Sequence, residues 1–267
     1  MNMKRVTSSL LGFPLVLLVL LIGNKHVVDV ALAIIAMIAM DEYFNAVKKV
    51  AKPVRWVGYV SCIGIALVHL IPLEYLNVVI SLSISLILIV LFAQVVATEM
   101  KTTFKDIAYT FIGIFYVVFL IMFVAFIDGM ENGKILIWYA LFAAWGTDIS
   151  AYFVGKFIGK HKFSKISPKK TIEGCLGGVV GAVIFMLVYT YFANTYWGME
   201  YSYLFIALIG IVLSIVGQIG DFAASSIKRF VDIKDFSNLI PGHGGLLDRI
   251  DSLIFLAPFA YVLFTLL

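Results

Sequence analysis

The sequence predicts an all-α membrane protein with about nine transmembrane helices, and three observations lead to this prediction. Of the 267 residues, 62% are hydrophobic and only 13% are charged, whereas soluble domains are roughly 45–50% apolar and about 25% charged. The apolar residues form runs long enough to cross a bilayer, which takes about 20 helical residues. The basic residues gather between alternate pairs of these runs. A soluble domain of this length could not bury so much apolar surface.

The apolar runs define the expected spans in order. They cover residues 6–23, 27–46, 55–72, 76–98, 107–127, 135–157, 173–195, 202–227 and 247–267. The first run follows Lys4 and Arg5, as a signal peptide would. No small-residue cleavage site follows it, so we interpret this run as an uncleaved membrane helix.

The basic residues predict the orientation of these spans. With a cytoplasmic N-terminus, 18 of the 20 lysines and arginines lie in cytoplasmic segments, and only Lys25 and Lys134 lie outside. This is a strong positive-inside distribution, and an extra or missing span would have disturbed it. We therefore expect the C-terminus on the outer side. No organelle-targeting segment is visible, so a bacterial plasma membrane is the expected location, with the active site facing the cytoplasm.

The two halves of the chain differ in character. Residues 1–130 are predicted to be a transmembrane scaffold, and residues 131–267 a transmembrane catalytic region. The acidic residues of the first half lie at or near cytoplasmic helix ends, where we interpret them as solvated: Asp41, Glu42, Glu99 and Asp106. The two cysteines lie in apolar or glycine-rich stretches without a CxxC pair, so a disulfide is not expected.

Asp148 is the first unusual residue of the second half. It lies eight residues before Lys156 inside an apolar run, which places it about 12 Å into the apolar layer. An ionisable group at that depth is costly and is a functional candidate. A structural aspartate bonded to a neighbouring helix is the alternative. Tyr152, Gly155 and Gly159 follow on the same helix face.

The loop after this span predicts an anion site. Ser167 and Pro168 are a typical cap and first helical residue. Lys169, Lys170 and Thr171 would then crowd a helix N-terminus, where free N–H groups and the helix dipole favour anions. An ordinary positive-inside loop or a lipid-headgroup patch are the alternatives. The glycines that follow indicate close helix packing: Gly174, Gly177, Gly178 and Gly181.

One polar stripe emerges at the end of span 202–227. Asp221, Ser225, Lys228 and Asp232 share a narrow helix face. A carboxylate, a hydroxyl and an ammonium group together suit a metal ion and a phosphate, although a plain amphipathic exit from the membrane would also give such a stripe.

The segment 234–251 combines glycines with two carboxylates. Gly242, Gly244 and Gly245 would allow backbone N–H groups to approach an anion closely. Asp248 and Asp251 stand one turn apart at the start of the last span, where they could simply be dipole partners. Because Asp221 and Asp248 are expected at the same cytoplasmic level, they suit Mg²⁺ and a polyphosphate.

At this point a family resemblance can be stated. The stretch from Ser225 to Asp251 resembles the signature of the phosphatidate cytidylyltransferases, also called CDP-diacylglycerol synthases. Its fixed positions are filled by Ser225, Lys228, Arg229, Lys234, Asp235, Ser237, Pro241, His243, Gly244, Gly245, Asp248, Arg249 and Asp251. The stretch 167–174 resembles the family's upstream motif. Asp148 with Ala151 and Tyr152, and Gly217 with Asp221, resemble two shorter elements, although Ile149-Ser150 replaces the usual Thr-Gly. The match covers about residues 145–258.

The resemblance implies an activity. CTP and phosphatidic acid would give CDP-diacylglycerol and pyrophosphate with Mg²⁺, in a homodimer with a lipid-accessible site. Asp221 and Asp248 would hold the metal, and His243 would bind phosphate or move a proton. The residues expected to be catalytic are Asp148, Asp221, Lys228, His243 and Asp248. Those expected to bind substrate are Ser167, Lys169, Lys170, Thr171, Ser225, Arg229, Gly244, Gly245, Arg249 and Asp251.

Other functions are less compatible with the sequence. A CDP-alcohol phosphotransferase would carry a D-G-x-x-A-R pattern, which is absent. A cytidylyltransferase for another lipid phosphate stays possible. A secondary transporter could use Asp148 as an ion site, but transporters favour two matching halves, and these halves are unlike. No nucleic-acid partner is expected.

Overall fold

The computed structural model of the chain describes residues 19, 23–164, 166–240, 242 and 244–267. Within these residues all regular structure is helical, and the β-pairing is limited to two isolated bridges. The all-α prediction is therefore confirmed for the described part. The first predicted span, 6–23, lies almost entirely outside the described residues. His243 also lies outside them.

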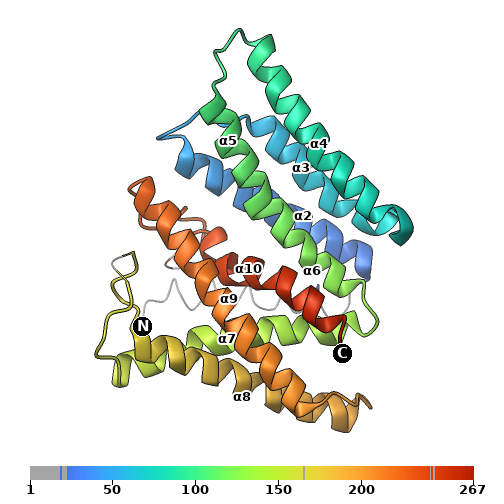
Figure 1. Cartoon of the computed structure of the whole chain (residues 1–267), viewed down its shortest axis with the longest axis vertical. Helices are drawn as coiled ribbons and strands as arrows, with labels where there is room; N and C mark the ends of the chain where they lie inside the picture. The colour runs from blue at the N-terminus through green and yellow to red at the C-terminus, as the bar shows by residue number, and fades with distance from the viewer. Residues whose placement is uncertain (1–18, 20–22, 165, 241, 243) are drawn as a thin grey trace. The chain divides into compact units, whose positions relative to one another are not determined.

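The helices follow the apolar runs of the sequence. They are α2 (Lys25–Val47), α3 (Arg55–Ala66), α4 (Leu73–Ala97), α5 (Phe104–Gly113), α6 (Leu120–Asp128), α7 (Gly133–Phe157), α8 (Ile172–Tyr196), α9 (Tyr203–Phe230) and α10 (Leu247–Phe264) (Figure 1). A 3₁₀ turn, Val68–Leu70, follows α3, and a π-helical segment, Ile114–Phe119, joins α5 to α6. Each predicted span from 27–46 onward thus overlaps one helix or successive helical segments.

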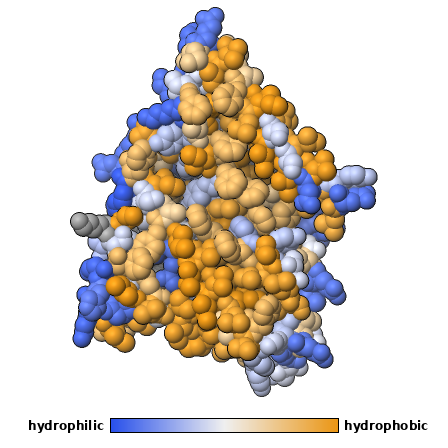
Figure 2. Space-filling view, in the orientation of Figure 1, coloured by the Kyte–Doolittle hydropathy of each residue, from blue (hydrophilic) through white to orange (hydrophobic). Residues whose placement is uncertain are grey.

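Four of these helical segments are long and apolar enough to cross a membrane. They are Leu73–Ala97, Phe104–Asp128, Ile172–Tyr196 and Tyr203–Phe230. Only 6% of an 18-residue apolar stretch of α4 is buried inside the molecule. Apolar side chains also cover much of the face shown in Figure 2. Soluble monomers rarely expose such large apolar patches. These surfaces support a membrane protein.

The chain forms two compact units. Of the described residues, the first contains those up to 125 and those between 231 and 249, and the second contains those between 126 and 230 and from 250 to 267. Segment 231–249 therefore groups with the N-terminal helices. The predicted division near residue 130 separated a scaffold from a catalytic region and was not based on compactness. It stays a prediction.

In the first unit, Asp106 holds the connection between α2 and α3. It forms a capping box with Thr103 at the start of α5, and its carboxylate also accepts a hydrogen bond from the Lys52 backbone N–H at 2.6 Å. One turn on, the Thr110 hydroxyl accepts from the Val54 N–H at 2.8 Å. Asp106 is only 5% exposed, so its interpretation as a solvated residue is wrong. The buried N–H groups of the connection need acceptors, and Asp106 supplies one.

In the second unit, glycines allow α7 and α8 to pack closely. A Cβ on Gly177 would lie 2.5 Å from Val154, one on Gly174 would lie 2.9 Å from the Ala151 carbonyl oxygen, and one on Gly181 would collide with Ser150. The predicted role of these glycines in helix packing is confirmed. Gly217 and Gly220 of α9 likewise face α10, where a Cβ on Gly220 would lie 2.6 Å from the Asp251 carbonyl oxygen. The two cysteines are free, as expected.

Candidate active site

A cavity of about 320 Å³ in the second unit brings several predicted site residues together. Its lining comes from α7, the following loop, the start of α8, and α9. The lining residues are Thr147, Asp148, Ala151, Tyr152, Gly155, Lys156, Lys169, Lys170, Thr171, Gly174, Cys175, Gln218 and Asp221. The sequence named five of these for function: Asp148, Lys169, Lys170, Thr171 and Asp221.

The loop before α8 differs from its prediction. Helix α8 begins at Ile172, and its cap is Thr171, whose hydroxyl accepts from the Gly174 N–H. Ser167 and Pro168 instead lie in a turn closed by a 3.0 Å bond from the Lys170 N–H to the Ser167 carbonyl oxygen. The predicted helix start was wrong because serine followed by proline suits the first two positions of a β-turn as well as a helix start.

Aromatic and polar contacts hold this loop against α9. The ring of Phe163 stacks on that of Phe222, with centroids 4.8 Å apart. The Lys170 ammonium lies 4.4 Å from the Phe222 ring centroid and pairs with Asp221. Arg229 donates a hydrogen bond to the Ile166 carbonyl oxygen at 3.4 Å. Lys170 is therefore fixed at the cavity wall by a helix that follows it by some fifty residues in sequence.

Glu173 fastens the other side of the same loop. Its carboxylate accepts from the backbone N–H groups of Lys160 and His161 at 3.1 and 3.3 Å, and it contacts the His161 Nδ1 at 2.6 Å. A single carboxylate in the first turn of α8 thus ties the end of α7 to the start of α8.

The charges around the cavity are mixed. Asp221 faces Lys170, and Asp148 is exposed on α7. Asp251, which is 7% exposed at the start of α10, interacts electrostatically with Asp221, Lys228 and Asp148. The structure therefore groups four predicted site residues of this unit around one charged region: Asp148, Lys228, Asp221 and Asp251.

The remaining predicted residues of this unit lie apart from the lining. Ser167 is half-buried in its turn and Ser225 is half-buried on α9, while Arg229 is exposed at the end of α9. The polar lining residues that the sequence analysis did not name for function include Thr147, Lys156 and Gln218. The Gln218 side chain donates to the Cys175 carbonyl oxygen at 3.2 Å and to the Ser214 hydroxyl at 3.3 Å. The sequence could have indicated Gln218, because it is a polar residue one turn before Asp221 in an apolar helix.

The described residues of the signature segment between 234 and 246 form a loop in the first unit, and Asp248, in the first turn of α10, organises it. Asp248 is 8% exposed, and its Oδ2 accepts from the backbone N–H groups of Phe236 at 2.8 Å and Gly245 at 3.0 Å. Gly244 has a positive φ of 88°, which glycine adopts without strain. The Gly245 N–H, predicted to bind an anion, therefore points to Asp248 in this structure. Arg249 is exposed.

Glu42 is the second carboxylate of this loop, and its predicted role was wrong. It is 4% exposed rather than solvated. It accepts from the Ser237 hydroxyl at 2.6 Å and from the backbone N–H groups of Leu246 and Leu247 at 2.8 and 2.7 Å. Nothing in the local sequence distinguishes Glu42 from its solvated neighbour Asp41.

The oxygen donors fit a magnesium ion. Among the described residues, no three histidine, cysteine or acidic side chains form a metal-binding group. Mg²⁺ is usually held by one or two carboxylates together with substrate phosphates. Carboxylates beside lysines, as in the cavity of the second unit, match that requirement.

Long apolar helices together with a cavity lined by lysines and aspartates fit a membrane enzyme that acts on lipids, and sequence comparison defines the class. The chain belongs to the cytidylyltransferase family, whose sequence profile matches residues 3–267. This confirms the family predicted from the signature.

Individual relatives carry a more specific name. The chain is 32% identical to the phosphatidate cytidylyltransferase of Staphylococcus aureus strain COL, in an alignment that covers 98% of each chain. It is 31% identical to that of Staphylococcus haemolyticus, over 97% of each chain. A segment of 137 residues, 51% of this chain and 49% of its relative, is 44% identical to the phosphatidate cytidylyltransferase of Bacillus subtilis.

Proposed function

We propose that this protein transfers CMP from CTP to phosphatidic acid and releases pyrophosphate, giving CDP-diacylglycerol for phospholipid synthesis. The observation that carries the proposal is the cavity in which Lys169 and Lys170 meet Asp148 and Asp221. Family membership and the names of the near full-length relatives support the same reaction. Lipid and nucleotide are both phosphate-bearing substrates, and the site supplies ammonium groups for them.

In this reaction, an oxygen of the phosphatidate phosphate attacks the α-phosphorus of CTP. The bond from that phosphorus to the oxygen bridging to the β-phosphorus breaks, and pyrophosphate leaves with that oxygen. A phosphate monoester is already anionic at pH 7, so no strong general base is needed. The barrier lies in aligning the two anions and neutralising the charge that accumulates.

The chain's own residues would perform both tasks. Lys169, Lys170, Lys228 and Arg249 would neutralise the triphosphate and the leaving pyrophosphate, and His243 would bind phosphate or move a proton. The ion pair with Asp221 and the contact with Phe222 favour one placement of the Lys170 ammonium. A positioned cation costs less ordering entropy on substrate binding than a mobile one.

Mg²⁺ is the expected cofactor, with Asp221 and Asp248 as its proposed ligands. When bound, it would neutralise phosphate charge and polarise the phosphoryl oxygens. Each proposed ligand is tested by its own substitution, Asp221→Asn or Asp248→Asn.

We further propose a topology of nine spans, with a cytoplasmic N-terminus, an outer C-terminus and the site facing the cytoplasm of a bacterial cell. The asymmetry of lysine and arginine supports this orientation. A homodimer is proposed on the family resemblance alone.

The substrate assignment is tested with purified protein in detergent. It would be incubated with CTP, Mg²⁺ and either phosphatidic acid or another lipid phosphate, with EDTA as the control. We expect a CDP-lipid and pyrophosphate only with phosphatidic acid and free Mg²⁺. Product from another lipid phosphate alone would retain the cytidylyltransferase chemistry and reject the proposed acceptor.

A further inference from the structure

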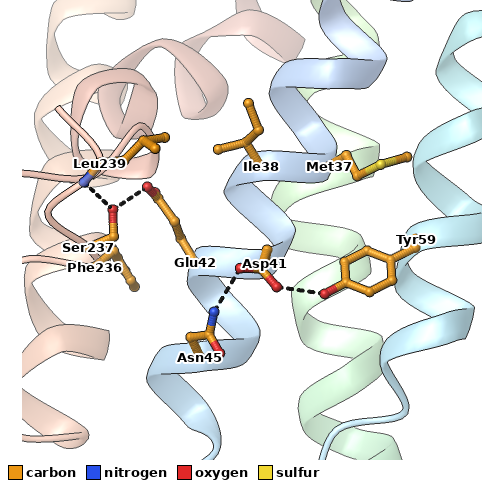
Figure 3. A pocket seen from close by; sticks show the side chains of 9 residues that line it. All are labelled: Met37, Ile38, Asp41, Glu42, Asn45, Tyr59, Phe236, Ser237 and Leu239. Atoms are coloured by element: carbon orange, nitrogen blue, oxygen red, sulfur yellow. Dashed lines mark hydrogen bonds between the residues drawn. The ribbon is translucent and has the colours of Figure 1, made fainter.

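The signature loop is held by a residue of the N-terminal region that the sequence gives no role. Glu42 lies near the end of α2, and the loop follows it by about two hundred residues. Both belong to the same compact unit. Figure 3 shows the Glu42 side chain pointing at Ser237, whose hydroxyl also accepts from the Leu239 N–H at 3.0 Å.

The carboxylate of Glu42 receives three donors. Its Oε1 accepts from the Ser237 hydroxyl at 2.6 Å and the Leu246 N–H at 2.8 Å, and its Oε2 accepts from the Leu247 N–H at 2.7 Å. Leu247 is the first residue of α10. The first N–H groups of a helix have no partner within the helix, so Glu42 supplies from a distant helix what a cap residue normally supplies locally. A negative charge is also favourable at that helix end.

The fit around this carboxylate is close. Glu42 is 4% exposed, and a Cβ added to Gly245 would lie 2.7 Å from its Oε2. A side chain at Gly245 would therefore displace the Glu42 carboxylate from its present position. A buried carboxylate without hydrogen-bond donors would be costly. The buried charge of Glu42 therefore requires its three donors.

Glu42 and Asp248 hold neighbouring N–H groups of one short segment. Asp248 accepts from Gly245 and Phe236, while Glu42 accepts from Leu246 and Leu247. The backbone on the N-terminal side of Asp248 is thus fixed at three successive residues. Loss of the Glu42 contacts would free this backbone, and with it the position of Asp248.

We infer that Glu42 is a positioning residue for the transferase reaction, which fixes the signature loop and thereby the carboxylate of Asp248. The inference rests on the proposed function for its kinetic consequence, but the fixing of the loop does not depend on that function. Glu42 itself is not expected to touch substrate.

The test compares Glu42→Gln with Asp41→Asn. Glutamine keeps the size of the side chain, but its amide offers one acceptor oxygen, and its NH₂ group would face an N–H donor. Asp41 is the matched control, because it is the adjacent residue of α2 and its carboxylate binds Tyr59 at 2.7 Å, Asn45 at 2.7 Å and Arg55 at 3.2 Å instead of the loop. Both variants remove one negative charge from the same helix end.

Two readouts separate positioning from general stability. Hydrogen exchange measures the amides of Gly245, Leu246 and Leu247, whose N–H groups donate to Asp248 and Glu42. Steady-state kinetics measures kcat and the Mg²⁺ concentration for half-maximal rate. For Glu42→Gln we expect exchange faster by about tenfold or more in this segment only. We also expect kcat lower by about tenfold or more and a raised Mg²⁺ requirement. Asp41→Asn should match the wild type within about twofold in both measurements.

A milder variant covers the case in which Glu42→Gln does not fold. Ser237→Ala removes one of the three donors, and it should give a smaller change in the same direction. Wild-type exchange and kinetics in Ser237→Ala and Glu42→Gln would overturn the inference, as would equal effects of Glu42→Gln and Asp41→Asn. If the wild type makes no CDP-lipid, the proposed function fails, whereas the exchange data still decide whether Glu42 fixes the loop.

Discussion

At the scale of single residues, three buried carboxylates of this chain hold backbone N–H groups in place. Glu42 and Asp248 each accept hydrogen bonds from two backbone N–H groups. Asp106 accepts one from the Lys52 N–H and also forms the capping box at the start of α5. Hydrogen bonds to a charged group contribute about 1.5–3 kcal/mol each. In these buried connections, such acceptors replace the water that an exposed loop would use.

Asp248→Asn should separate the structural role of this residue from its chemical one. An asparagine oxygen can still accept from Phe236 and Gly245, so the fold should persist, whereas an amide is a poor ligand for Mg²⁺. We expect CDP-lipid formation to fall by roughly 10²–10³-fold, with a melting temperature within a few degrees of the wild type. Near-normal turnover would remove Asp248 from the metal site.

Lys228→Ala should affect substrate use more than stability. Lys228 is half-buried on α9 and interacts with Asp251. Loss of one charge-assisted contact to phosphate corresponds to about 1.5–3 kcal/mol, so kcat/KM should fall by roughly ten- to a hundredfold. The measurement is kcat/KM for each substrate beside a thermal melt. A lower melting temperature with unchanged kcat/KM would assign Lys228 a structural role.

At the scale of helices, the sequence predicted where the helices lie along the chain better than it predicted the loops and long-range contacts that join them. The apolar runs predicted the helices, and the glycines of α8 predicted its contact with α7. The start of α8 was misplaced, because Ser167 and Pro168 fit a turn as well as a helix start. Glu42 was misread because its partners lie about two hundred residues away. Periodicity within a helix carries no information on such contacts.

Gly181→Ala tests the packing of α7 against α8. The added Cβ would collide with Ser150, and overpacking of this kind typically costs about 1–3 kcal/mol. We expect a melting temperature lower by several degrees in detergent. Gly64→Ala is the control, because a Cβ at Gly64 of α3 meets nothing within 4 Å. Equal melting temperatures for the two variants would contradict the close approach of α7 and α8.

At the scale of the whole molecule, the proposal concerns a membrane topology. Cysteine labelling in intact cells tests it after Cys62 and Cys175 have been replaced by alanine. Glu131 and Lys101 are both exposed, in the α6–α7 and α4–α5 connections respectively. An impermeant maleimide should label Glu131→Cys from outside and should label Lys101→Cys only after lysis. The reverse pattern would invert the topology, and with it the cytoplasmic location of the site.

The most direct test of the central claim follows the label of CTP. Purified protein would be given phosphatidic acid, Mg²⁺ and CTP labelled at either the α- or the γ-phosphorus. Attack at the α-phosphorus predicts that α-label enters the lipid while γ-label appears only in pyrophosphate. Lipid carrying γ-label, or α-label that stays in soluble nucleotide while wild-type protein binds CTP, would contradict the transfer of CMP.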